Sequence, residues 1–347
     1  KWTAKFDELG NEIEGACFGV EGEPVVGADG YAIRTTKYDQ RGNPIERAYF
    51  GTDCKPIKNK EGYAKVVSKF NERGEETELA FFGPDGRPVL SDVGISIVRA
   101  KFDDLGMQRE TSYFGTSGEP LNGVDGYARW TSTYDARGNP TEFAYFAADG
   151  KPVRGHNGAA IIRMEHDSRG NEVSISYLGE DGRPLLNQEG VARWALEFDE
   201  RGNETSIAGF GVDGSPALSI LKSHRVRQKF NPHGMVVEKA HFGVRGEPLL
   251  NGLGFHREVL DYDTHSRLIR KTWLDLRGEP VINPSAGAAV LEYIRDIYGN
   301  LVDRRFFGVD LRMLSNPPKT NESDSPDLET TIRELRRKHS DQNADDL

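Results

Sequence analysis

One short pattern recurs along this chain every 32 residues, and it limits the possible folds more than any other feature. The segments 39–43, 135–139, 167–171 and 199–203 all read Asp-x-Arg-Gly-Asn. Looser copies follow the same step from Asp7, Asn71, Asp103, Asn231 and Asp263, and a last copy at Asp296 comes one residue late. A strict period of this size is typical of repeat architectures. We therefore expect about ten similar units rather than one globule built around a catalytic cluster.

A single unit, residues 126–152, has the pattern of a β-hairpin. Residues 127–134 are rich in aromatic and β-branched types that alternate with period two, which indicates a strand. Asp135 to Gly138 match a type I turn closed by a left-handed glycine, and residues 139–146 form the return strand. Asp149-Gly150 and Pro152 then predict a second turn.

The turn also predicts which residues lie opposite each other. If Asp135 pairs with Asn139, Trp130 faces Ala144 and Ala128 faces Phe146, so large residues oppose small ones on a buried face. The same rule sets Trp194 against Ala208, Ala32 against Phe50 and Trp2 against Ala16. The other face would pair cations with aromatic rings: Arg129 with Tyr145, Lys65 with Phe81 and Arg257 with Trp273.

These units predict an all-β fold, in which tandem 32-residue β-hairpin repeats form an elongated twisted sheet or a superhelical solenoid. The alternative is a closed propeller-like ring, for which 32 residues is short per blade. We expect the array to occupy residues 1–314, with its first repeat truncated and the preceding sequence unknown. Residues 315–347 would form a linker and a short C-terminal helix or a disordered tail. In that helix Ser325 would be the cap, with Leu328, Ile332 and Leu335 on one face.

Composition excludes several classes of function. A net charge of -10 spread along the chain argues against a nucleic-acid binder, and no apolar run is long enough to predict membrane insertion. Cys17 and Cys54 have no metal-binding spacing, and neither a signal peptide nor another clue to the compartment is visible. The chain lacks a nucleophile elbow, a phosphate-binding loop and a dinucleotide fingerprint. We expect no enzyme, no cofactor and no metal.

Two turn motifs resemble known families. Tyr-Asp-x-x-Gly-Asn at residues 38–43 and 134–139 resembles the YD-type repeats of Rhs-like bacterial proteins. Phe-Gly-x-Asp-Gly-x-Pro at residues 82–88 is similar to WG-type and MORN-like β-hairpin repeats. The period is longer than that of typical YD repeats, and the Trp-Gly signature is absent. The resemblance implies a bacterial β-repeat scaffold used for interaction or encapsulation, and it carries over no catalytic residue.

The predicted cation and aromatic face is the best functional candidate. Regularly spaced aromatic rings beside arginines have the composition of binding hot spots, although they also suit a second packing layer. Our hypothesis is a scaffold that binds a protein partner. The alternatives are a carbohydrate-binding surface module that stacks sugars on these rings, or a sensor or targeting region of a larger multidomain protein. The candidate residues are Tyr49, Phe81, Tyr113, Arg129, Tyr145, Tyr177, Arg193, Arg225, Arg257 and Trp273.

Overall fold

The computed structural model describes residues 1–155 and 158–315, and all of their regular structure is β-strand. The described residues divide into two compact units, one up to residue 161 and the other from residue 162 to residue 315. The first unit contains β1 (Trp2–Phe6), β2 (Glu12–Cys17), β3 (Ile33–Tyr38), β4 (Pro44–Phe50), β5 (Lys65–Phe70), β6 (Glu76–Phe82), β7 (Ile97–Phe102), β8 (Gln108–Phe114), β9 (Arg129–Tyr134) and β10 (Pro140–Phe146). The second contains β11 (Ile161–His166), which starts at the boundary, β12 (Glu172–Leu178), β13 (Arg193–Phe198), β14 (Glu204–Phe210), β15 (Arg225–Phe230), β16 (Val236–Phe242), β17 (Arg257–Tyr262), β18 (Leu268–Leu274), β19 (Val290–Arg295) and β20 (Leu301–Phe307).

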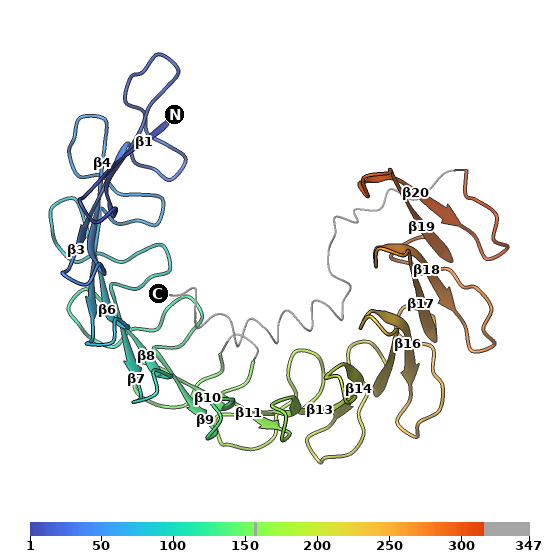
Figure 1. Ribbon diagram of the computed structural model, residues 1–347. Helices are drawn as coiled ribbons and strands as arrows, with labels where there is room; N and C mark the ends of the chain where they lie inside the picture. Colours follow the sequence, from blue (N-terminus) through green and yellow to red (C-terminus); the bar gives the residue numbers. More distant parts are fainter. Residues whose placement is uncertain (156–157, 316–347) are drawn as a thin grey trace. The chain divides into compact units, whose positions relative to one another are not determined.

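Within each unit consecutive strands pair antiparallel, from β1 to β10 and from β12 to β20, as the repeat pattern predicts. Each repeat contributes one hairpin, for example β3 with β4, and the return strand then pairs with the next repeat, as β4 does with β5. Figure 1 follows this order from the blue β1 to the red β20. Neither unit's sheet closes on itself, so the propeller-like alternative is wrong. The expected C-terminal helix lies outside the described residues.

The Asp-x-x-Gly turn forms as the sequence predicts. The Asp135 carboxylate accepts hydrogen bonds from the backbone N–H groups of Arg137 (2.8 Å) and Asn139 (2.9 Å) and from the Asn139 side chain (2.9 Å). Gly138 has a φ of 88°, the left-handed conformation that closes such a turn. Each turn thus satisfies its own polar groups, which explains why the pattern recurs so strictly.

The predicted pairing within the hairpins is wrong by one residue. Tyr134 pairs with Pro140 as expected, but a bulge follows, and Thr133 then pairs with Glu142. Trp130 therefore faces Tyr145 and not Ala144, while Phe146 faces Arg129 and not Ala128. The same shift sets Trp194 against Gly209, Ile33 against Phe50 and Trp2 against Cys17. Because side chains alternate along a strand, this slip exchanges the two faces of the return strand.

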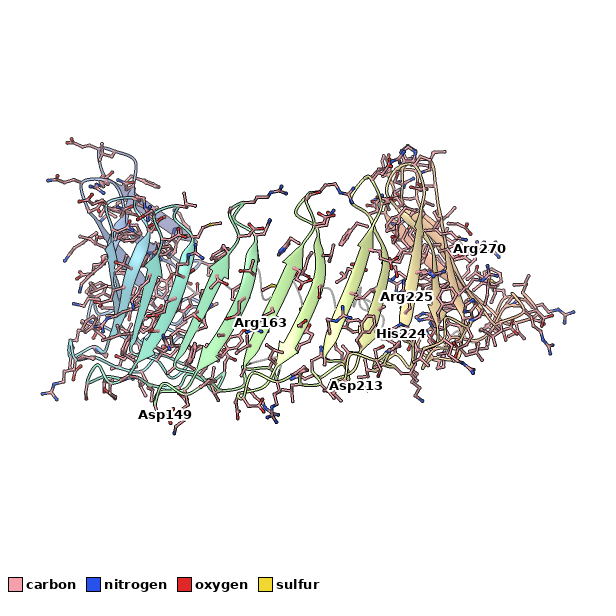
Figure 2. The ribbon with its side chains drawn as sticks, turned by 90° about the horizontal axis from the view of Figure 1, so that it is seen from below. Asp149, Arg163, Asp213, His224, Arg225 and Arg270 are labelled. Atoms are coloured by element: carbon pink, nitrogen blue, oxygen red, sulfur yellow. The ribbon has the colours of Figure 1, made fainter. Side chains whose placement is uncertain are left out.

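Neighbouring repeats are also joined at their turns. At one end of the strands, the Arg of Asp-x-Arg-Gly-Asn donates to a carbonyl in the following turn, as Arg169 does to Asp199 (2.7 Å) and Arg201 to Pro232 (3.0 Å). At the other end, backbone N–H groups bridge successive loops, as Lys60 does to Asp29 (2.9 Å). Asp149 and Asp213 lie in turns beyond the strand ends, whereas Arg163 and Arg225 lie on strands (Figure 2). The hydrogen bonds at both ends of the strands fix each hairpin against the next one.

Candidate binding surface

The six predicted aromatic residues lie in the interior instead of on a working surface. Tyr49, Phe81, Tyr113, Tyr145, Tyr177 and Trp273 are all less than 9% exposed. A loop following each return strand covers these rings: the Tyr145 ring, for example, lies against Gly155, where an added Cβ would come within 2.8 Å of it. These rings therefore occupy a packing layer, which was the alternative interpretation of the sequence pattern.

A second set of rings, which was not predicted, interleaves with the first. Tyr31 lies 4.8 Å from Tyr49 between ring centroids, and Tyr127 lies 4.9 Å from Tyr145. Tyr63 completes the set, 4.6 Å from Phe81. The signal was present in the chain, since Gly-Tyr-Ala recurs at residues 30–32, 62–64 and 126–128. We call both sets together the aromatic layer. It stabilises the repeats through tilted and edge-to-face ring contacts.

Ile95 interrupts the aromatic layer of the first unit. Ile95 stands where Tyr31, Tyr63 and Tyr127 stand in other repeats, and an apolar cavity of about 120 Å³ opens beside it. Phe81 and Tyr113 are among the residues that line this cavity. Typical ligand sites have at least roughly 300 Å³, so this cavity is smaller than a typical ligand site.

Burial also changes how the layer responds to alkali. It raises the pKa of the Tyr145 hydroxyl from 10.0 to about 12, because the tyrosinate would lose its hydration. The folded state thus holds this proton more tightly than the unfolded chain does. The resulting stability is fully present below pH 10.0 and is lost as the pH rises through about 12.

We therefore expect Tyr145→Phe to reduce the loss of stability between pH 10.0 and about 12. Denaturation midpoints measured across this range by circular dichroism would show the difference. Tyr298→Phe is the matched control, because Tyr298 is 83% exposed. An equal alkaline loss in both variants would contradict the assignment.

The predicted arginines lie on the opposite face, which we call the cation face. Arg129, Arg193, Arg225 and Arg257 occupy equivalent first positions of β9, β13, β15 and β17. The Arg129 guanidinium lies 4.1 Å from the centroid of the Phe146 ring, and Arg193 lies 4.0 Å from that of Phe210. Lys65 over Phe82 (5.1 Å) and Arg99 over Phe114 (4.5 Å) repeat this contact. The structure thus brings Arg129 and Arg193 together with phenylalanines. It places all four predicted arginines on the face opposite the six predicted aromatic residues.

Arg225 and Arg257 differ from this pattern. Arg225 faces Phe242, but Arg227 supplies the cation over that ring, at 5.0 Å from its centroid. Arg225 instead contacts Glu197 at 2.8 Å. Arg257 faces Leu274, which has no aromatic ring. The cation face therefore carries stacked pairs in most repeats and ion pairs alone in others.

Recurrent glutamates link the cations of this face. Glu110 lies between Lys101 (2.8 Å) and Arg129 (3.3 Å), and Glu238 lies between Lys229 (2.8 Å) and Arg257 (3.5 Å). Burial raises the pKa of the Glu110 carboxyl, but hydrogen bonds and charge from Lys101 and Arg129 outweigh burial and lower it overall. These equivalent carboxylates have similar surroundings. That arrangement holds cations in place and does not resemble an acid–base pair.

Three histidines of the second unit are buried packing residues. The Nδ1 atom of His224 lies 2.7 Å from the Gly209 carbonyl oxygen, and that of His256 lies 2.9 Å from the carbonyl oxygen of His241. The rings of His224 and His256 meet Phe210 and Phe242 edge to face. Within residues 1–155 and 158–315, no group of three or more His, Cys, Asp or Glu side chains is arranged to hold a metal ion.

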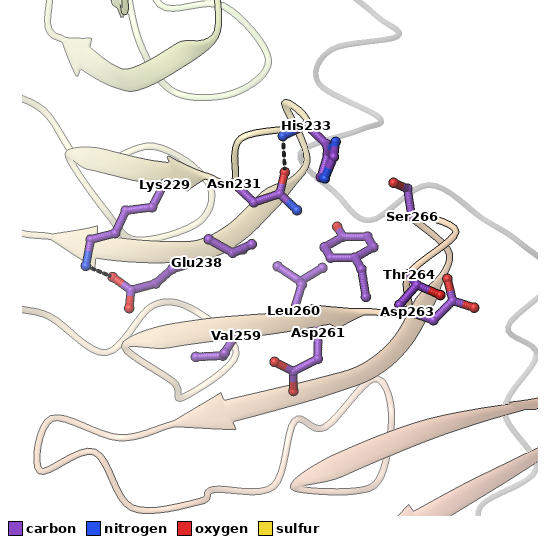
Figure 3. Close-up of a pocket in the computed structure, with 12 residues that line it drawn as sticks. Lys229, Asn231, His233, Glu238, Val259, Leu260, Asp261, Asp263, Thr264 and Ser266 are labelled. Atoms are coloured by element: carbon purple, nitrogen blue, oxygen red, sulfur yellow. Dashed lines mark hydrogen bonds and ion pairs between the residues drawn. The ribbon is translucent and has the colours of Figure 1, made fainter.

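A hollow of about 460 Å³ lies along β15 to β17 in the second unit (Figure 3). Lys229 is already paired with Glu238 there, and Asn231 accepts a hydrogen bond from the backbone N–H of His233 (3.0 Å). Val259 and Leu260 supply apolar lining. This ion pair and this hydrogen bond hold turns and strands together, so they give no basis for a catalytic role.

Comparisons with known proteins give only distant structural likenesses. No protein-family model matches the chain, and no curated protein matches it. Its structure is similar to part of TcdB2-TccC3 without the hypervariable C-terminal region, with 14% sequence identity and a TM-score of 0.34 over 92% of this chain and 16% of that one. A Photorhabdus luminescens Tc holotoxin pore gives 14% identity and a TM-score of 0.33 over 88% and 16%. A porin-like protein from Bacteroides uniformis gives 9% and 0.21 over 70% and 87%.

No helix within the described residues is long and apolar enough to cross a membrane.

Proposed function

We propose that this chain is a non-enzymatic repeat scaffold that binds protein through its cation face. The observation that carries this proposal is the repeated stack of a partly exposed cation on a phenylalanine ring, held from the side by a glutamate. The Arg129 side chain keeps 36% of its surface exposed while it contacts both Phe146 and Glu110. Arg99 keeps 47% between Phe114 and Glu78.

Such an arginine is ordered before a partner arrives. Side-chain ordering is one of the costs of association, so a guanidinium already fixed by a ring and a carboxylate loses less freedom on binding. Arginine and aromatic residues are also enriched among the side chains that dominate interface energies. Because the stacked arginine recurs from repeat to repeat, several such groups would be available to one extended partner.

The charge balance of the face favours a protein partner. Each cluster combines cations with a carboxylate, as in Lys69–Glu78–Arg99 (2.7 and 2.8 Å). Such mixed charge suits a protein surface that carries both signs, whereas a polyanion such as nucleic acid requires a consistently basic surface. A sensor or targeting role within a larger multidomain protein would use the same contacts.

The carbohydrate alternative loses its main support. It required Tyr145 and Trp273 to stack on sugar rings, but these residues are only 8% and 3% exposed. The phenylalanines of the cation face already carry cations on their rings. We therefore do not retain a glycan as the proposed ligand.

An affinity capture from lysate of the source organism would test the proposal. We expect the variant Arg129→Gln/Arg193→Gln/Arg257→Gln to lose a protein that the wild type retains, with at least roughly tenfold weaker recovery. The matched control is Arg87→Gln/Arg183→Gln/Arg312→Gln, which removes the same charge from turn residues 86–88% exposed.

The control should retain the protein. Equal recovery by the wild type and both variants would contradict binding through the cation face. Equal loss in both variants would show that net charge matters and the positions on the cation face do not.

A further inference from the structure

The aromatic layer of the first unit is a row of neighbouring rings that is broken at one repeat. The Tyr63 ring lies between two others, with its centroid 5.9 Å from that of Tyr49 and 4.6 Å from that of Phe81. One repeat later, Phe81 and Tyr113 take the flanking positions, but Ile95 stands in the position of Tyr63. The apolar cavity of about 120 Å³ lies at this break in the row.

Two neighbouring positions keep the space beside Ile95 open and apolar. Val93 stands where Glu61, in the preceding repeat, accepts a hydrogen bond from the Tyr63 hydroxyl. Gly123 contributes no side chain, and an added Cβ there would lie only 3.2 Å from the Ile95 Cδ1 atom. This repeat therefore lacks both a tyrosine ring and the carboxylate that would bind its hydroxyl, and the next loop does not fill the space.

The walls of the cavity are mainly apolar and belong to the packed interior. Phe81, Tyr113 and Tyr127 contribute rings, and Leu79 and Val98 contribute aliphatic groups. The three rings and Val98 are only 5–9% exposed. Because these side chains are held by their neighbours before any ligand arrives, little ordering is required on binding.

The cavity reaches the surface beside two valines. Val93 and Val124 line it and are 44% and 70% exposed. Asp125 also lines it and is exposed. The valines give an apolar ligand access to the cavity, whereas the Asp125 carboxylate disfavours an anion.

We propose that this cavity is a binding site for one apolar aromatic ring of the size of a phenyl group. A cavity of about 150 Å³ lined by aliphatic and aromatic side chains is sufficient to hold benzene, and the space beside Ile95 is similar in size and lining. A ring bound there would contact Phe81 and Tyr113 as Tyr63 contacts its neighbours, so aromatic contacts add to apolar burial. A free monocyclic aromatic compound and a phenylalanine of a partner protein share this chemistry, and the test separates them.

Isothermal titration calorimetry of the full chain with toluene would test the site. We expect one toluene per chain, with a dissociation constant below about 1 mM. Benzoate should bind at least roughly tenfold more weakly, because its carboxylate would lose hydration beside Asp125.

Two tyrosine variants control for the position of the ligand. Ile95→Tyr should fill the cavity and abolish toluene binding, and its denaturation midpoint should not fall, since tyrosine occupies this position in three other repeats of the first unit. Leu90→Tyr is the matched control, because Leu90 belongs to the same repeat, is 46% exposed and does not line the cavity. This control should retain toluene binding.

A capped peptide Gly-Ser-Phe-Ser-Gly separates the two sources of the ring. Displacement of toluene by the peptide would assign the site to a partner's side chain, and toluene binding without displacement would assign it to free aromatic compounds. Four results would overturn the proposal: no binding of toluene, binding that persists in Ile95→Tyr, equal loss in both tyrosine variants, and equal binding of benzoate. The proposal does not rest on the cation face, because the Arg→Gln variants leave every residue of the cavity in place.

Discussion

Replacing Trp273 with alanine is expected to lower the free energy of unfolding by about 3–5 kcal/mol. Trp273 is 3% exposed and packs in the buried cluster that contains Phe255, Leu291 and Phe306. Its Nε1–H also donates a hydrogen bond to Glu258 at 3.1 Å. The substitution thus opens a cavity and removes a partner from a buried carboxylate. Urea denaturation followed by circular dichroism measures the change.

Trp2→Ala is the control for this prediction. Trp2 has the same side chain but is 42% exposed on the outermost strand β1. We expect its loss to cost less than about 1 kcal/mol. Similar costs at the two positions would contradict the buried position of Trp273, which the corrected register requires.

The second large effect is expected at a turn glycine. Gly138→Val should lower the free energy of unfolding by about 1–3 kcal/mol, because a β-branched residue is forced to a φ of 88°. The added Cβ would also lie 2.7 Å from the Met107 Cε atom. The same denaturation experiment measures it.

Gly138→Asn provides the comparison at the same position. Asparagine tolerates the left-handed conformation, and the array itself holds Ser266 at the equivalent turn position with a φ of 61°. We expect the asparagine variant to be more stable than the valine variant by at least about 1 kcal/mol. Equal midpoints would mean that the turn is wrongly assigned.

The turns made most of this fold predictable from sequence. Asp-x-x-Gly-Asn is a local signal whose carboxylate and glycine act within five residues, so its meaning does not depend on the rest of the molecule. Its period then predicted tandem hairpins and an open sheet. The packing of the faces was less accessible, because the bulge between Pro140 and Glu142 has no comparable residue signature.

The one-residue error in the predicted pairing explains why the candidate site residues lie on two different faces of the sheet. Pairing large residues with small ones placed Arg129 beside Tyr145, whereas the structure pairs large with large, as in Trp130 with Tyr145. Six of the ten candidate residues consequently belong to the aromatic layer, and the four arginines belong to the cation face. An available signal was the apolar row at Val66, Val98, Trp130, Ile162, Trp194 and Val226, which had to lie with the buried rings.

Chemical nitration of tyrosines tests the sorting of residues into a buried aromatic layer and an exposed cation face most directly. After brief reaction of the folded protein, mass spectrometry would quantify modification at each site. We predict that Tyr298, which is 83% exposed, reacts at least about tenfold faster than Tyr49, Tyr113, Tyr145 and Tyr177, which are 4–8% exposed. Comparable modification of Tyr145 and Tyr298 would contradict the account, because it would mean that the aromatic layer is exposed to solvent.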